Sequence, residues 1–256
     1  IDYLESSAMI AYIENNTFNN TYYPMEFEYP AYFDVAWDDT RPSYFYIRNN
    51  VAYNIKYEFI YYYENYYAPV YFYIENVIAT GDPAYFWNIC FFDMEYAEYG
   101  DLYIDINNVY VSGGQYGFYY SEDEYADAYI TIRNSVFENV YYGVYMDYPA
   151  YYSDYFRLDI INTQFYISEY GEGIYMYYMC YDYGTLFEMN IVDSLFDDYS
   201  GDDYWYESGI YVDEGYYGNS FWTFINTSFL NYYEYGWYLE GLDYGATATI
   251  WMYDGM

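Results

Sequence analysis

Short runs of alternating apolar and polar residues recur along the chain, and each run ends at an asparagine. One run reads Ile130-Thr-Ile-Arg-Asn134, and a phenylalanine follows three residues later at Phe137. Alternation with a period of two places successive side chains on opposite faces of a strand. Neighbouring copies are separated by 26 residues (Asn108 to Asn134) to 34 residues (Asn15 to Asn49). Such a recurrence predicts stacked coils, because no single coil can bury its own apolar face. The position that ends each run is held by Asn15, Asn49, Asn76, Asn108, Asn134, Asn162, Asp193 and Asn226.

A second strand motif follows the later asparagines and begins with glycine. It reads Gly-apolar-aromatic-apolar, as in Gly143-Val-Tyr-Met146 and Gly173-Ile-Tyr-Met176. The middle aromatic residue of this strand is expected to point away from the core. Stacked strands lie about 4.8 Å apart, so these side chains are expected to form one outward column. Its members are Tyr119, Tyr145, Tyr175, Tyr211 and Tyr238.

Stacking is also expected to create inward columns. The apolar residue two positions before each later asparagine or aspartate forms one of them: Ile47, Ile74, Ile106, Ile132, Ile160, Ile191 and Phe224. The asparagines, with Asp193 in the same row, are expected to point inward as a second column. Their amides can hydrogen-bond along the stack and can satisfy backbone groups at a buried corner.

The repeating units resemble the right-handed parallel β-helix superfamily, which includes pectate-lyase-like proteins, phage tailspikes and many surface proteins. The resemblance rests on units of the "ITIRNSVFEN…GVYM" type and covers roughly residues 11 to 252. It implies an all-β fold, a right-handed parallel β-helix (β-solenoid) of about eight coils, in a single domain spanning residues 1–256. This scaffold carries lyases, hydrolases, adhesins and stalks, so the resemblance does not select a function.

The charge balance excludes several classes of partner and chemistry. The chain has 41 Asp and Glu against 5 Lys and Arg, a net charge of −36, and contains no histidine. Such a surface repels nucleic acid and anionic membranes. Without histidine there is no Ser-His or Cys-His nucleophile pair and no imidazole metal site. Few lysines with abundant tyrosine and asparagine are typical of an exported protein, so we expect an extracellular or cell-surface location.

One acidic cluster is a candidate metal site, and no other cofactor is expected. Asp197, Asp198, Asp202 and Asp203 lie in the longest insertion between an anchor and its following glycine. Carboxylates gathered on one turn can hold Ca²⁺ through oxygen ligands. The alternative is a solvated acidic loop, since carboxylates are abundant throughout this chain.

The cysteines and the glycosylation sequons complete the candidate chemistry. Cys90 and Cys180 lie three coils apart, beyond disulfide reach, so we expect two packed thiols and no bridge. Sequons occur at Asn15, Asn19 and Asn226. Because Asn15 and Asn226 belong to the ladder expected to point inward, only Asn19 is expected to be an acceptor.

Two functional hypotheses follow. The repeat begins within about ten residues of Ile1 and still runs at Ala248-Thr-Ile-Trp-Met252. Chains that stack head to tail without closing form filaments. The first hypothesis is therefore a non-enzymatic subunit of an extracellular filament, adhesin or surface layer. The alternative is a protein that binds or cleaves a neutral polysaccharide. The outward tyrosines can serve as a sugar platform or a subunit interface, or can simply stabilise the sheet. Charge transport along stacked tyrosines is a third hypothesis that the sequence does not test.

Overall fold

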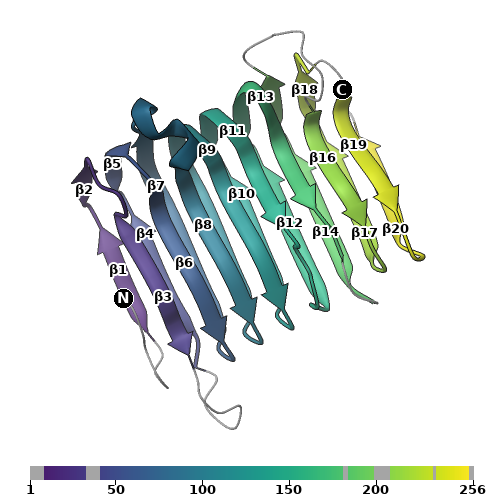
Figure 1. The fold of residues 1–256 in the computed structure, drawn as a ribbon, viewed down its shortest axis with the longest axis horizontal. Coiled ribbons are helices and arrows are strands. Elements are labelled where there is room, and N and C mark those ends of the chain that lie inside the picture. The colour runs from purple at the N-terminus through teal and green to yellow at the C-terminus, as the bar shows by residue number, and fades with distance from the viewer. Residues whose placement is uncertain (1–8, 33–40, 181–183, 199–207, 233–234, 254–256) are drawn as a thin grey trace.

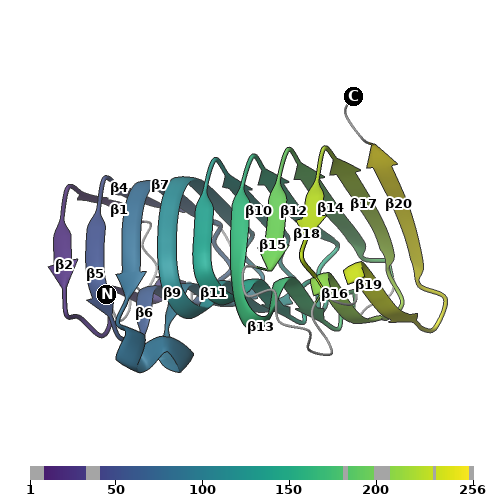
Figure 2. The ribbon, with the colours of Figure 1, turned by 90° about the horizontal axis from the view of Figure 1, so that it is seen from above.

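The protein is a parallel β-solenoid with three faces, wound from one end of the molecule to the other (Figures 1 and 2). The computed structural model describes residues 9–32, 41–180, 184–198, 208–232 and 235–253. Each strand pairs in parallel with the strand one coil away, so the predicted all-β solenoid is confirmed. A short 3₁₀ helix, η1 (Pro83–Asn88), stands beside the coils (Figure 2). Among the described residues, no helix is long and apolar enough to cross a membrane.

The first face carries the alternating runs that end at asparagine, in continuous register. Its strands are β1 (Ile10–Glu14), β4 (Ser43–Arg48), the start of β7 (Val70–Gly81), the start of β9 (Leu102–Glu124), β10 (Ala128–Arg133), β12 (Tyr155–Ile161), β14 (Leu186–Val192), β17 (Asn219–Ile225) and β20 (Thr247–Tyr253).

The second and third faces share several long strands that bend around the corners. The second face contains β2 (Thr17–Asn19), β5 (Val51–Ile55), later parts of β7 and β9, the starts of β11 (Val136–Asp147) and β13 (Gln164–Tyr177), β15 (Leu195–Asp198) and β18 (Ser228–Leu230). The third face contains β3 (Met25–Tyr32), β6 (Glu58–Tyr66), β8 (Cys90–Glu98), the ends of β9, β11 and β13, β16 (Ser208–Gly215) and β19 (Tyr235–Leu242).

The apolar column of the first face forms the centre of the core. Its predicted members are at most 2% exposed, and the prediction is confirmed: Ile47, Ile74, Ile106, Ile132, Ile160, Ile191 and Phe224. Every inward side chain therefore packs on the equivalent side chain of the coils before and after it. This arrangement makes stability a property of stacking rather than of any single coil.

The asparagines stand at the corner between the first and second faces, in the left-handed backbone region. Their φ angles range from 47° at Asn162 to 59° at Asn15. Most L-residues are destabilised there by about 1–2 kcal/mol, whereas asparagine and aspartate tolerate it. The expectation that these side chains point inward is wrong, because all eight are exposed. The left-handed turn directs them to solvent.

The exposed amides nevertheless bond along the stack. Asn76 Nδ2 donates to Asn49 Oδ1 at 3.2 Å, and Asn162 Nδ2 donates to Asn134 Oδ1 at 2.9 Å. The row is broken at Asn134, whose amide donates to Asn107 instead of Asn108. The ladder therefore lies on the surface.

In several coils, the residue that directly follows the corner asparagine or aspartate is a serine or threonine. Its side chain occupies the buried corner in place of the asparagine. Ser135 is buried; its hydroxyl accepts from the backbone N–H of Val109 at 3.1 Å and donates to the carbonyl of Arg133 at 2.8 Å. Thr163 and Ser194 occupy the same place in later coils and bond to turn carbonyls in the same way. These hydroxyls satisfy backbone groups that water cannot reach.

The glycine of the second motif is required by the phenylalanine of the first. A Cβ added to Gly143 would lie 2.5 Å from the ring of Phe165 and 2.5 Å from the carbonyl oxygen of Gly173. In early coils the small and large residues are exchanged. Phe59 stands in the column of Gly117, and Ala79 of the following coil stands in the column of Phe137. The motif is thus absent from early coils because another pair fills the same volume.

Cys90 and Cys180 are buried in separate coils and form no disulfide bond with each other, as expected.

Candidate functional site

The third face carries the predicted outward tyrosine column. Strand pairing aligns Tyr145 with Tyr119 and Tyr175, and aligns Tyr211 with Tyr175 and Tyr238. Successive ring centroids are 5.1 to 5.4 Å apart, and the first four rings lie within 12° of parallel to their neighbours. All five side chains are partly exposed. The structure therefore brings these tyrosines together as a continuous aromatic surface.

Four of the five hydroxyl groups in this column have raised pKa values: those of Tyr119, Tyr145, Tyr175 and Tyr211. Burial, followed by the charge of Asp213, raises the pKa of Tyr175 to about 12. Burial and the charge of Asp147 raise the pKa of Tyr145 further. Tyr211 donates its hydroxyl proton to Glu240. The column is therefore a neutral aromatic strip, edged by carboxylates, on an acidic molecule.

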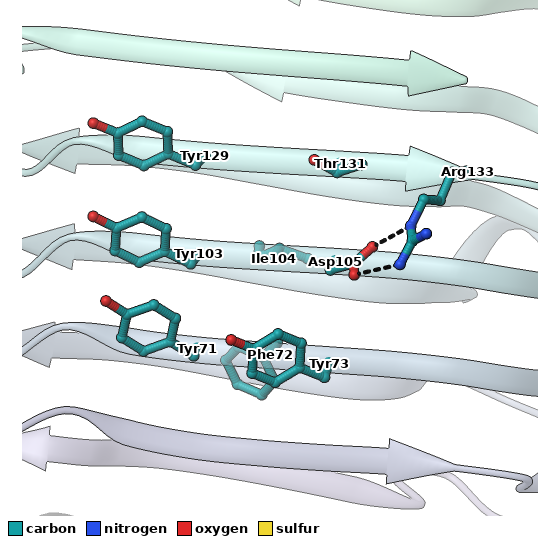
Figure 3. Close-up of a pocket in the computed structure, with 9 residues that line it drawn as sticks. All are labelled: Tyr71, Phe72, Tyr73, Tyr103, Ile104, Asp105, Tyr129, Thr131 and Arg133. Atoms are coloured by element: carbon teal, nitrogen blue, oxygen red, sulfur yellow. Dashed lines mark hydrogen bonds and ion pairs between the residues drawn. The ribbon is translucent and has the colours of Figure 1, made fainter.

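The first face carries a second tyrosine column, which the sequence analysis missed. Tyr71 and Tyr103 stack with centroids 4.4 Å apart and ring planes at 5°, and Tyr103 and Tyr129 stack at 4.7 Å and 2° (Figure 3). Tyr44 extends the column by one coil. The available signal was a tyrosine five residues before each of Asn49, Asn76, Asn108 and Asn134.

A shallow groove of about 270 Å³ lies beside this second column. It arises because the neighbouring outward column passes from Tyr73 to the smaller side chains of Asp105 and Thr131. Arg133 closes the groove through a bidentate pair with Asp105, with both N···O distances 2.9 Å (Figure 3). The groove thus combines flat rings with a hydroxyl, a carboxylate and a guanidinium, groups that can stack on and hydrogen-bond to a sugar.

The acidic calcium candidate is only partly described. Asp202 and Asp203 lie outside the described residues. Asp197 and Asp198 are consecutive in β15, so their side chains point to opposite sides of the strand. Asp198 is buried, whereas Asp197 is half-buried and accepts a hydrogen bond from Asn231 Nδ2 at 2.6 Å. Over the described ranges, no group of three or more acidic or cysteine side chains is placed to hold a metal ion.

The three sequons all lie on the surface. Asn15, Asn19 and Asn226 are each exposed. The expectation that only Asn19 is accessible is therefore wrong, and it fails for the same reason as the inward ladder. The amide of Asn226 donates to Asp193 at 2.8 Å, and the amide of Asn54 donates to Asn19 at 3.2 Å.

The outermost described coils expose residues that inner coils bury. At one end, Ile13 is half-buried, whereas Ile47 beside it in the next coil is fully buried; at the other end, Met252 is 57% exposed. Met252 continues the apolar column formed by Phe224 and Ile191, which are almost fully buried. Both ends of the described solenoid therefore present apolar side chains beside strand edges that pair with no further described strand.

Comparison of the chain with protein-family models, with curated proteins and with solved structures gave no match.

Proposed function

We propose that the protein is a structural β-solenoid subunit that stacks head to tail in an extracellular filament, adhesin or surface layer. The observation that carries this proposal is the match between its two exposed ends. Following the register through every coil, Met252 belongs to the column of Ile13, and Trp251 to the column of Tyr12. A second copy placed on β20 continues both columns without a change of register.

The backbone supports the same arrangement. Inside the solenoid, backbone N–H groups at this corner donate to the strand of the following coil, as Asn15 does to the carbonyl of Arg48 at 3.1 Å and Asn162 does to the carbonyl of Val192 at 2.8 Å. Over the residues that the structure describes, the outer edges of β1 and β20 pair with no further strand, and they present the two halves of this pattern. Because the strands are parallel, every added copy leaves a new free edge, and the contact does not close on itself.

A charge placed at the junction tests this proposal. Met252→Lys puts an ammonium group into the apolar column where the second copy would stack. Thr223→Lys adds the same charge to the outer face of the preceding coil, where Thr223 is half-buried. Sedimentation velocity should show large assemblies for the wild type and for Thr223→Lys, and their loss for Met252→Lys. Identical sedimentation of all three proteins as monomers would contradict the proposal.

The groove on the first face favours a second candidate function, the binding of a neutral glycan. The supporting observation is the row of parallel rings at Tyr71, Tyr103 and Tyr129 beside the Asp105–Arg133 pair. On a neutral oligosaccharide array, Tyr103→Ala should lose binding, whereas Tyr53→Ala, an exposed tyrosine of the second face, should retain it. Binding that is absent from the wild type, or equal in both variants, would reject this function.

The corner asparagines and the parallel coils support membership in the right-handed parallel β-helix superfamily, whose pectate-lyase-like members share this architecture. An extracellular or cell-surface location is supported by the composition, which is rich in tyrosine and asparagine and poor in lysine.

A further inference from the structure

The outward column of the third face is interrupted where a ring is missing. Asp93 pairs with Tyr61 on one side and with Tyr119 on the other, so it takes the place of a tyrosine. In the adjacent column, Cys90 stands between Glu58 and Tyr116. Two small side chains, Cys90 and Asp93, thus stand where the following coil carries the rings of Tyr116 and Tyr119. The result is a hollow of about 280 Å³, the size of a small-molecule pocket.

The hollow is walled by aromatic and polar side chains. The rings of Tyr116 and Tyr119 meet at 66° with centroids 5.3 Å apart and form one corner. Gln115 donates to the hydroxyl of Tyr116 at 3.0 Å, and Asn88 comes from the end of η1. The carboxyl groups of Glu58, Asp93 and Glu95 complete the lining.

Two of these carboxyl groups have buried oxygens without hydrogen-bond partners. Asp93 is 9% exposed, and its Oδ1 has none; the same holds for Oε2 of Glu58. Glu95 differs, because its Oε2 accepts from the hydroxyl of Tyr61 at 3.3 Å. A buried polar atom without a partner is destabilising by about 1–3 kcal/mol. These two oxygens therefore lack a donor, and none of the residues that line the pocket is a lysine or arginine.

We propose that this pocket binds the primary ammonium group of a small alkylamine. An ammonium group carries three donors and no acceptor, which matches the free oxygens of Asp93 and Glu58. Its alkyl chain can lie against Tyr116 and Tyr119, whose ring faces also attract cations. This function is independent of head-to-tail stacking and of glycan binding on the first face.

Proton release provides a signature of this binding mode. Burial, followed by the charges of Glu95 and Glu58, raises the pKa of Asp93 to about 8. Burial raises the pKa of Glu58 to about 7. The other titratable groups that line the pocket or bond to it are Cys90, Tyr61, Tyr116 and Tyr119, which are all neutral at pH 7 at their raised pKa values. A bound ammonium favours the carboxylate forms, so binding at pH 7 expels protons into the buffer.

Isothermal titration calorimetry with n-butylammonium tests the proposal on the full chain. Titrations at pH 7 and about 0.15 M salt, in two buffers of different ionisation enthalpy, should show binding with net proton release. Asp93→Asn should weaken the affinity at least tenfold and reduce the proton release. Asp213→Asn is the matched control, since it removes one half-buried carboxyl from the same face, four coils along the chain, and should bind as the wild type does.

Two further ligands separate the ammonium site from simpler explanations. Neutral n-butanol should not bind, and tetramethylammonium, which has the charge but no donors, should bind at least tenfold more weakly. Equal binding of n-butanol would show a merely apolar hollow, and equal binding of tetramethylammonium would show charge attraction alone. Either result, or no binding of n-butylammonium to a folded wild type, would overturn the proposal. Glu58→Gln provides a second variant should Asp93→Asn fail to fold.

Discussion

Single residues set the shape of each corner and the chemistry of the one acidic pocket described above. Asparagine recurs at the first corner because the backbone is left-handed there, and the amide ladder follows from that placement. Asp93, in contrast, differs from the tyrosines on either side of it in its column, and it is buried near other carboxyl groups. One residue type is thus explained by the repeat, and the other by an exception to it.

Replacement of a corner asparagine should reveal the backbone contribution. Asn162→Ala keeps the exposed position but places an ordinary L-residue at a φ of 47°. We expect a loss of about 1–2 kcal/mol in the free energy of unfolding. Asn162→Gly should cost less, because glycine adopts this φ freely. Urea denaturation measures both values; an equal loss in the two variants would mean that the side-chain ladder, rather than the backbone, holds the turn.

Asp93 should make the fold less stable as the pH rises. Its pKa is about 8 in the folded protein, against an ordinary value of 3.8, so between these values the folded state holds a proton that the unfolded state has released. The free energy of unfolding should fall by about 1.4 kcal/mol for each pH unit in this window. Asp93→Asn should remove this part of the slope, leaving the smaller contribution of Glu58. Urea titrations at pH 5, 6, 7 and 8 test this; an unchanged slope in Asp93→Asn would contradict the assignment.

At the scale of strands, each coil is held by pairs of residues that fill one volume together. Gly143 and Phe165 form such a pair, while Phe91 occupies the glycine position in an early coil. The glycine of the second motif is therefore explained by packing against a phenylalanine. The early coils lack this glycine but still belong to the repeat.

Gly143→Ala should disturb this packing strongly. The new methyl group would meet both the ring of Phe165 and the backbone oxygen of Gly173, so we expect a loss of about 1–3 kcal/mol. Gly241→Ala in β19 is the control, because nothing lies within 4 Å of the added Cβ. It should be neutral or stabilising by up to about 1 kcal/mol. Thermal denaturation compares the two variants, and similar melting temperatures would contradict the packing rule.

At the scale of the whole molecule, the parallel solenoid, the apolar column and the outward tyrosines could be predicted because they follow from a repeated period. The direction in which the side chains of Asn134 and its equivalents point could not be predicted. The alternation of inward and outward side chains is interrupted at each corner, so the period of the strand does not extend to the turn residue. The pocket at Asp93 could not be predicted either. Its carboxyl groups come from β6 and β8, and only the strand register brings them together.

The high negative charge should oppose assembly at low salt. With a net charge of −36, two copies repel each other over distances greater than the contact itself. Screening shortens that range from about 30 Å at 0.01 M salt to about 8 Å at 0.15 M. Light scattering should therefore show assembly increasing with sodium chloride concentration. Assembly that weakens as salt is added would point to contacts between opposite charges instead of stacked coils.

Electron microscopy of the purified protein at about 0.15 M salt tests the central proposal most directly. Head-to-tail stacking predicts unbranched filaments one solenoid wide, in which the strand spacing of about 4.8 Å continues across each junction from β20 to β1 of the next copy. Met252→Lys should break these filaments into single subunits, and Thr223→Lys should leave them intact. Discrete monomers of the wild-type protein, or filaments joined through their side faces, would contradict head-to-tail stacking.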